Sequence, residues 1–187
     1  MDGRRQRSEV SRDRIVRAML DLISAGDVTP SAEAVAARAG VGLRTVFRHF
    51  ENMESLYQQI NALMSAEIRP MAERPFASSE WKARLIEIID RRIGIFERIM
   101  PFKIAADVHR HRSAFLTAQA AQLVRDQRAA LGAVLPDHNR DDAALIEGLD
   151  LLLSFDTWRR LRKDQKLTRP RARAVLERLV GALIATG

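Results

Sequence analysis

One stretch, residues 31–56, constrains what this chain can fold into more than any other; it reads SAEAVAARAGVGLRTVFRHFENMESL. Its pattern predicts two short helices joined by a tight turn and followed at once by a third helix. Ser31 can cap the first helix, because its hydroxyl can accept from a free backbone amide. Gly40 suits the left-handed residue that ends this helix. Four apolar residues are spaced to pack against one another and against a preceding helix: Val35, Val41, Val46 and Phe50.

The second predicted helix, over residues 43–50, carries a cationic and hydrogen-bonding outer face. The residues left outside the core are Leu43, Arg44, Thr45, Phe47, Arg48 and His49. A short helix with such a face has the form of a recognition helix that enters the major groove of DNA. The stretch therefore predicts a helix-turn-helix.

These residues resemble the helix-turn-helix signature of the tetracycline-repressor (TetR) family of bacterial transcription regulators, roughly T-x-x-x-I-A-x-x-A-G-V-S-x-x-T-L-Y-x-H-F-x-x-K-E-x-L. Ser31 stands for the opening Thr and Val35-Ala36 for the Ile-Ala pair. The remaining matches are Ala39, Gly40, Val41, Thr45, His49, Phe50, Glu54 and Leu56. Three positions depart from it, each losing a group that the family typically turns toward phosphate: Gly42 for Ser, Phe47 for Tyr and Met53 for Lys. The signature covers about the first third of the chain.

The resemblance implies DNA contacts for Ser31 and for the outer face of the second helix. The candidates for base edges are Leu43, Arg44, Thr45 and Arg48. An arginine can bind guanine O6 and N7 together, which is worth about 1–3 kcal/mol of discrimination. Thr45 and His49 are expected to hold phosphate, whereas Phe47 can only pack or contact a sugar.

Basic residues are concentrated near the N-terminus. Residues 4–17 hold six arginines against Glu9 and Asp13: Arg4, Arg5, Arg7, Arg12, Arg14 and Arg17. We interpret this cluster as phosphate contacts, with Arg4, Arg5 and Arg7 as site residues, and hypothesise that it compensates for Phe47 and Met53. A second basic excess, over residues 157–178, is interpreted as a solvated helix end and connector. The net charge of +7 favours an anionic partner.

The composition, with 29% charged and 47% hydrophobic residues, describes a soluble globular protein. There is no long apolar run and no signal peptide, so we expect a cytoplasmic protein without a membrane partner. The lack of cysteine excludes disulfides, thiol catalysis and cysteine-ligated zinc. A metal site at Asp107, His109 and His111 has too few ligands, and surface polar residues are the favoured interpretation. No nucleophile–base pair appears, so neither an enzyme nor a cofactor is expected.

The rest of the chain shows helical periodicity and no alternating runs, which predicts an all-α fold of about nine helices. We expect a first helix over residues 10–24 and a fourth that stops before Pro70. Ser79 is expected to cap a helix that Pro101 breaks, with a separate short helix over residues 102–109. Further helices are expected over residues 141–161 and 168–186. The predicted domains are a helix-turn-helix DNA-binding domain, 1–52, and an effector-binding and dimerisation domain, 53–187.

The last two predicted helices carry more apolar residues than one core-facing stripe requires. A helix that is apolar on two faces is either fully interior or packed on both its own core and a partner, and we favour the second interpretation. The resemblance agrees, because family members typically dimerise through these helices. The predicted interface residues are Leu145, Leu149, Leu152, Val175, Leu179 and Leu183.

An effector pocket is implied by the resemblance alone. Its expected walls hold aromatic and flexible residues: Trp81, Phe96, Met100, Phe102, Phe115, Phe155 and Trp158. The sequence is thus interpreted as a homodimeric, ligand-responsive repressor that binds a palindromic operator and a hydrophobic small molecule. Two alternatives stay open: a DNA-binding dimer without a small-molecule effector, and a helical interaction protein that has lost DNA binding.

Overall fold

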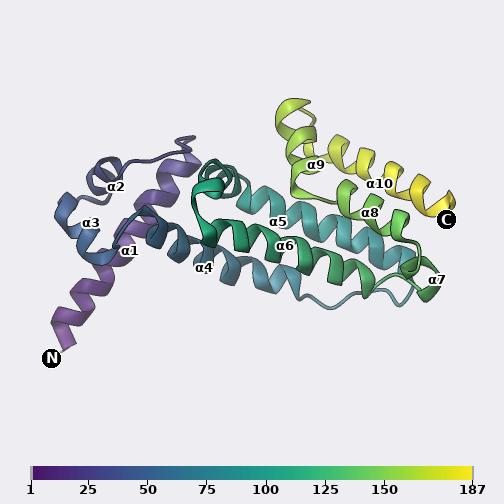
Figure 1. Cartoon of the computed structure of the whole chain (residues 1–187), viewed down its shortest axis with the longest axis horizontal. Helices are drawn as coiled ribbons and strands as arrows, with labels where there is room; N and C mark the ends of the chain where they lie inside the picture. The colour runs from purple at the N-terminus through teal and green to yellow at the C-terminus, as the bar shows by residue number, and fades with distance from the viewer. Residues whose placement is uncertain (1, 187) are drawn as a thin grey trace. The chain divides into compact units, whose positions relative to one another are not determined.

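The structure is a computed structural model that describes the backbone of residues 2–186 and the side chains of residues 6–185. Over that range the chain forms ten α-helices and no strand, which confirms the predicted all-α fold (Figure 1). They are α1 (Asp2–Ser24), α2 (Ala32–Ala39), α3 (Leu43–His49), α4 (Met53–Ala72), α5 (Trp81–His109), α6 (Ala114–Gly132), α7 (Asp137–Arg140), α8 (Ala143–Leu152), α9 (Phe155–Arg159) and α10 (Arg169–Thr186). A 3₁₀ turn (Arg110–Arg112) follows α5, and a π-helical turn (Arg160–Asp164) follows α9.

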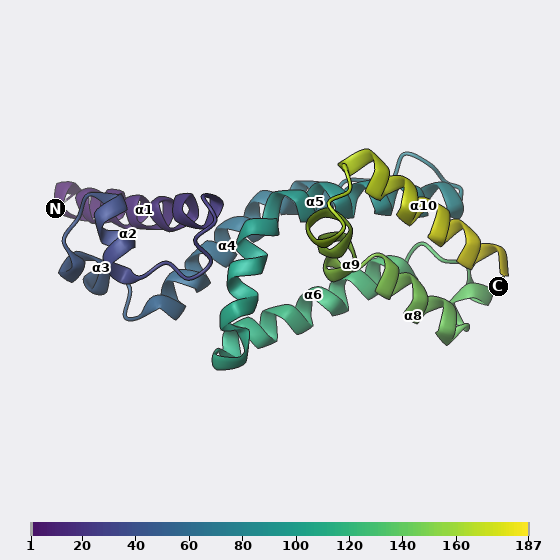
Figure 2. The ribbon, with the colours of Figure 1, turned by 90° about the horizontal axis from the view of Figure 1, so that it is seen from above.

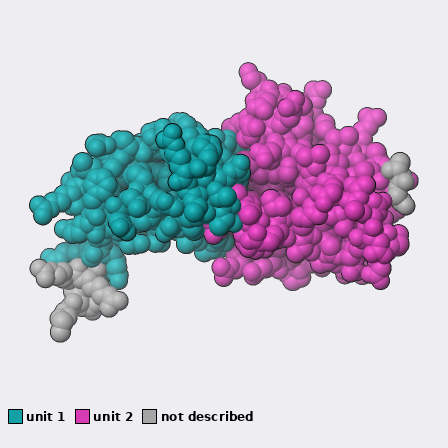
Figure 3. Space-filling view, viewed as in Figure 1, with its two compact units in different colours: residues 1–67, 99–118 teal, residues 68–98, 119–187 magenta. Residues whose placement is uncertain are grey.

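The chain divides into two compact units (Figure 3). Unit 1 comprises residues 1–67 and 99–118, and unit 2 comprises residues 68–98 and 119–187. Helices α4, α5 and α6 each contribute residues to both units. The domain boundary expected after residue 52 lies inside unit 1, and the division into DNA-binding and effector-binding domains stays a prediction.

Unit 1 is built around the apolar stripe of α1. Figure 2 shows α1, α2 and α3 grouped together, and α1 contacts both of the shorter helices. Ile15, Met19 and Ile23 recur at helical spacing and are almost fully buried. The other large members of this core are Val16, Val35, Val46, Phe50, Leu56, Tyr57, Ile60, Phe102 and Leu116. The four apolar positions predicted to pack together all belong to this core or, for Val41, pack against it.

Unit 2 packs α5 against the C-terminal helices. The rings of Phe96 and Phe155 meet edge to face, with their centroids 5.6 Å apart. Trp158 is fully buried, and its indole Nε1 donates to a carboxylate oxygen of Glu97 at 3.0 Å. A buried arginine, Arg92, donates to the backbone carbonyls of Leu153 and Gln127, at 3.0 and 2.6 Å.

Two prolines that were expected to end helices lie inside them. Helix α4 runs through Pro70, and α5 runs through Pro101. Proline removes one backbone donor, so the carbonyl four residues earlier loses its helical partner. In α5 the cost is offset because apolar residues are buried on both sides of the proline, at Phe96, Met100 and Phe102. The predicted separate helix over residues 102–109 was therefore wrong.

Other predicted boundaries were also wrong. The helix expected over 141–161 is broken, because the Ser154 hydroxyl accepts from Thr157 N at 3.2 Å and starts α9 as a new helix. Helix α5 is capped by Glu80, whose carboxylate accepts from Ala83 N at 2.9 Å, rather than by Ser79. Helix α1 begins at Asp2, well before residue 10.

Candidate nucleic-acid interface

The α2–α3 pair has the local geometry that its residues predict. Ser31 is the N-cap of α2, and its hydroxyl accepts from Ala34 N at 3.2 Å. Gly40 ends α2 in the left-handed conformation, with φ 65° and ψ 40°, where a side chain would be strained. Gly42 occupies the N-cap of α3 and provides no side-chain hydrogen bond there. The substitution of glycine for the family's serine thus leaves the start of α3 without a side-chain cap.

Helix α3 has one side packed in the core of unit 1 and one side that faces solvent. Val46 and Phe50 are buried, at 1% and 3% exposure. Leu43, Arg44, Phe47 and Arg48 are exposed, and Thr45 and His49 are half-buried. The exposed face therefore combines two guanidinium groups with two apolar side chains, which suits contacts to base edges and thymine methyl groups.

Arg12 fixes α3 to its neighbours. Its guanidinium donates to the His49 backbone carbonyl at 3.3 Å and to Gln59 Oε1 at 2.8 Å. The same group lies over the Phe50 ring, 4.7 Å from the ring centroid. Arg12 thus joins α1, the end of α3 and α4, a role that sequence reasoning missed when it grouped this residue with phosphate contacts. Its spacing from Ile15 and Met19, which places it on the buried side of α1, could have indicated this role.

His49 lies partly inside the unit rather than wholly on the outer face. Its Nε2 is enclosed and has no hydrogen-bond partner among the described residues. Burial, together with the positive charges of Arg48 and Arg12, lowers the pKa of His49 below its usual range. The imidazole is therefore neutral at pH 7, and any contact to phosphate would come from a neutral side chain.

The N-terminal arginines are described only in part. The side chains of Arg4 and Arg5 lie outside the described residues. Arg7 lies on α1 with an exposed side chain. Ser31, besides capping α2, is also exposed.

Comparison with known proteins agrees with this geometry. Residues 15–60 match the family model of bacterial regulatory proteins of the tetR family. The chain carries a TetR-family DNA-binding domain. Its fold is similar to the crystal structure of SCO7518 from Streptomyces coelicolor A3(2), a proposed transcriptional regulator, with a TM-score of 0.59 and 21% sequence identity over 91% of this chain and 98% of that chain. No curated protein matches the sequence.

The residues predicted to line an effector pocket fall in both units. Met100, Phe102 and Phe115 belong to unit 1, where Phe102 lies 6.3 Å from Tyr57 between ring centroids. Trp81, Phe96, Phe155 and Trp158 belong to unit 2. Five of the seven are buried, and Trp81 and Phe115 are half-buried. A ligand contact stays a prediction for all seven.

The predicted dimer residues differ in exposure. Leu145 and Leu149 are buried in unit 2, at 3% and 0%, so they pack on the core of their own chain. Leu152, Val175 and Leu183 are half-buried, and Leu183 lies close against Gly148 of α8. Leu179 is 44% exposed. Sequence reasoning did not select Leu151, which is 68% exposed at the end of α8. The position of Leu151 on the outer side of its helix depends on how α8 packs.

Two of the three residues considered for a metal contact other side chains. Lys103 Nζ lies 2.6 and 2.7 Å from the two Asp107 carboxylate oxygens, and the His109 ring lies 5.3 Å from Tyr57 between centroids. Among the described residues, no cluster of three or more potential ligands could hold a metal ion. No helix in the described part of the chain is long and apolar enough to cross a membrane.

Proposed function

We propose that this TetR-family regulator binds a palindromic operator as a homodimer and represses transcription until a hydrophobic ligand releases it. The observation that carries the proposal is the division of α3, with Val46 and Phe50 anchored in the core and Leu43, Arg44, Phe47 and Arg48 turned to solvent. A single helix of this length contacts few base pairs, so a two-fold dimer is needed to double the site.

The roles within α3 follow from position and chemistry. Arg44 lies in the first turn, where recognition helices contact base edges, and its guanidinium can bind guanine in a bidentate way. Leu43 is 37% exposed beside it and can contact a thymine methyl group. Thr45, which is half-buried, is suited to a phosphate or base contact at the edge of the interface.

Release by a ligand requires that the ligand bind one conformation better than another. The functional conformation would place two recognition helices about 34–36 Å apart, one turn of DNA. The second candidate, a dimer with no small-molecule effector, is favoured by the packing of Phe96 against Phe155 and of Trp158 against Glu97. A thermal-shift screen with hydrophobic ligands separates the two, because a bound ligand raises the stability of the native state.

The test of DNA recognition is selection of random duplex DNA on the purified protein at near-physiological salt. We expect a palindrome to be recovered, and Arg44→Ala with Thr45→Ala to abolish its selection. Arg125→Ala is the matched control, because it removes an exposed arginine from α6, outside residues 15–60. Binding that is indifferent to sequence in the parent protein would overturn the proposal and favour an interaction protein.

A further inference from the structure

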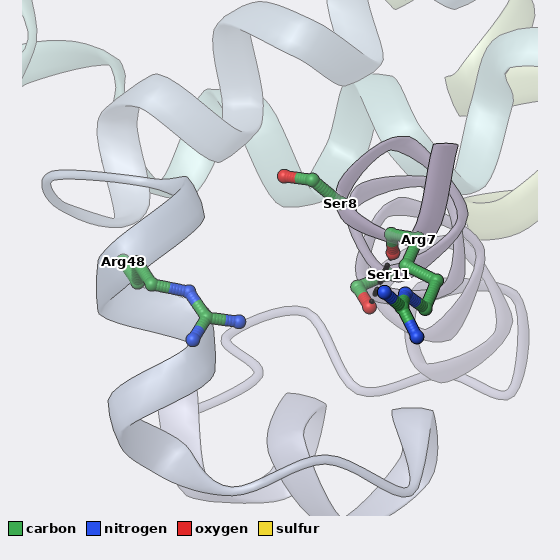
Figure 4. Close-up of a pocket in the computed structure, with 4 residues that line it drawn as sticks. All are labelled: Arg7, Ser8, Ser11 and Arg48. Atoms are coloured by element: carbon green, nitrogen blue, oxygen red, sulfur yellow. Dashed lines mark hydrogen bonds between the residues drawn. The ribbon is translucent and has the colours of Figure 1, made fainter. Parts of the chain in front are cut away.

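A hollow lies between the N-terminal part of α1 and the end of α3. Its described lining residues are Arg7, Ser8 and Ser11 of α1 and Arg48 of α3, and its volume is about 540 Å³ (Figure 4). Figure 4 shows Arg48 reaching from α3 toward α1, while the Ser8 hydroxyl points from α1 toward the α3 side. Arg7 and Ser11 are one helical turn apart and therefore share a face of α1.

The chemistry of this lining is that of an anion site. Two guanidinium groups and two hydroxyls line the hollow, and none of the described lining residues is acidic. Guanidinium groups pair with phosphate oxygens in a planar, two-point geometry, and hydroxyls can add a donor. Two like charges that face a common space repel each other, and an anion placed between them relieves that repulsion.

Arg12 fixes α1 and α3, the two walls of the hollow, relative to each other. This residue follows Ser11 on α1 and donates to the carbonyl of His49, the residue that follows Arg48 on α3. On α1 itself, Ser11 Oγ donates to the Arg7 carbonyl at 3.0 Å, which fixes the Ser11 side chain. The backbone positions of both arginines are therefore set before any ligand arrives, and less ordering is needed on binding.

We propose that this hollow, the α1–α3 notch, holds one phosphodiester group of the DNA backbone between Arg7 and Arg48. The inference rests on the proposed function and deepens it. Arg48 is then a backbone contact that sets the position of α3 on the duplex, and base discrimination falls to Leu43, Arg44 and Thr45. This assignment differs from the expectation that Arg48 contacts a base edge.

The test is a double-mutant cycle with Arg7→Ala, Arg48→Ala and the combined variant, with Ser8→Ala added to isolate the hydroxyl. Arg7, Ser8 and Arg48 are all exposed, so we expect the alanine variants to retain the fold. Binding of the full-length protein is measured by fluorescence anisotropy on the selected operator and on random duplex over a range of salt concentrations. Arg125→Ala controls for the loss of net charge alone.

We expect each single variant to weaken binding to operator and random duplex by the same factor. The slope of log affinity against log salt should fall by about one, as for the loss of one phosphate contact. Because both arginines hold the same phosphate, the loss in the combined variant should be smaller than the product of the single losses. Ser8→Ala should weaken binding without changing the slope.

Three results would overturn the notch. The first is that Arg48→Ala changes which base pairs are selected. The second is that the affinity losses of Arg7→Ala and Arg48→Ala multiply in the combined variant. The third is that the slope of log affinity against log salt in these variants equals that of Arg125→Ala. If the parent protein selects no operator, the proposed function fails, but the cycle on random duplex still tests the notch. If the parent protein binds no DNA at any salt concentration, both proposals fail.

Discussion

Arg12 shows how one side chain can determine where a recognition helix lies. It joins three helices of unit 1 through the His49 carbonyl, Gln59 and the Phe50 ring. A lysine could not reproduce this arrangement, because its single ammonium lacks the planar fork that serves two acceptors and stacks on a ring. Arg12 therefore stabilises the fold, although it lies in an arginine-rich segment that would suit contacts to nucleic acid.

The first prediction concerns Arg12→Ala. We expect the free energy of unfolding to fall by about 1–2 kcal/mol, a value discounted because the side chain is only half-buried. Chemical denaturation followed by circular dichroism measures the change. Arg17→Ala, an exposed position on the same helix, is the control and should change stability by less than about 0.5 kcal/mol. Equal effects of the two substitutions would show that Arg12 contributes charge rather than structure.

The second prediction concerns the pH dependence of stability at His49. Its pKa is lowered in the folded chain, so the unfolded chain binds more protons at mildly acidic pH. The contribution of His49 to the free energy of unfolding is therefore fully present above its usual pKa of 6.5. This contribution is lost as the pH falls through the pKa that His49 has in the folded chain. In His49→Gln, unfolding free energy measured from about pH 7 to about pH 5 should fall less steeply than in the parent protein. A variant as steep as the parent would exclude this histidine as the cause.

At the scale of elements, the helix-turn-helix could be predicted because its signals are local. Ser31 and Gly40 act on backbone groups within a few residues, so the sequence alone indicates where α2 begins and ends. At Pro101, by contrast, the sequence predicted a helix break that the structure does not contain. Whether a helix continues through proline depends on burial on both sides, which is a property of the tertiary structure. The exposure of Leu151 and the burial of Leu149 likewise depend on packing that periodicity does not reveal.

The break between α8 and α9 is held by specific hydrogen bonds within unit 2. Thr157 N, which would continue the helix by donating to the Leu153 carbonyl, donates to the Ser154 hydroxyl instead. Arg92 supplies the missing donor to Leu153 and binds the Gln127 carbonyl of α6 as well. Burial lowers the pKa of Arg92 to about 10, and the group remains charged at neutral pH. A buried cation therefore satisfies the carbonyl that the break between the two helices leaves without its helical donor.

The third prediction follows from this arrangement. We expect Arg92→Ala to lower the free energy of unfolding by about 2–4 kcal/mol, because the carbonyls of Leu153, which is buried, and Gln127, which is half-buried, lose their guanidinium donor. Denaturation of the full chain measures the loss. The comparison is Arg125→Ala, in which an exposed arginine of α6 is removed and little change is expected. A loss below about 1 kcal/mol would mean that the two carbonyls find other donors without cost.

At the scale of the whole molecule, the proposed operator site requires two copies of the chain, and we propose that they meet at exposed apolar residues of unit 2. Leu151 of α8 and Leu179 of α10 are 68% and 44% exposed, and these two helices contact each other directly. Exposed leucines on two helices that contact each other are the basis of this proposal. The proposed surface shares Leu179 with the interface predicted from the sequence, whereas Leu145 and Leu149 are buried within their own chain.

The fourth prediction is that Leu151→Glu and Leu179→Glu convert a dimer into a monomer. A carboxylate buried at the interface without a cation is costly, so association weakens while the core is untouched. Sedimentation velocity should show the parent protein at twice the chain mass of 21.1 kDa and the variants at that mass. Val124→Glu is the matched control, because Val124 of α6 is 46% exposed and lies on neither helix.

Because a monomer presents only one recognition helix, the Leu151→Glu and Leu179→Glu variants should also bind a single half-site as tightly as they bind the palindrome. Dimerisation unaffected by either leucine substitution, or abolished by Val124→Glu, would place the interface on another face of the molecule.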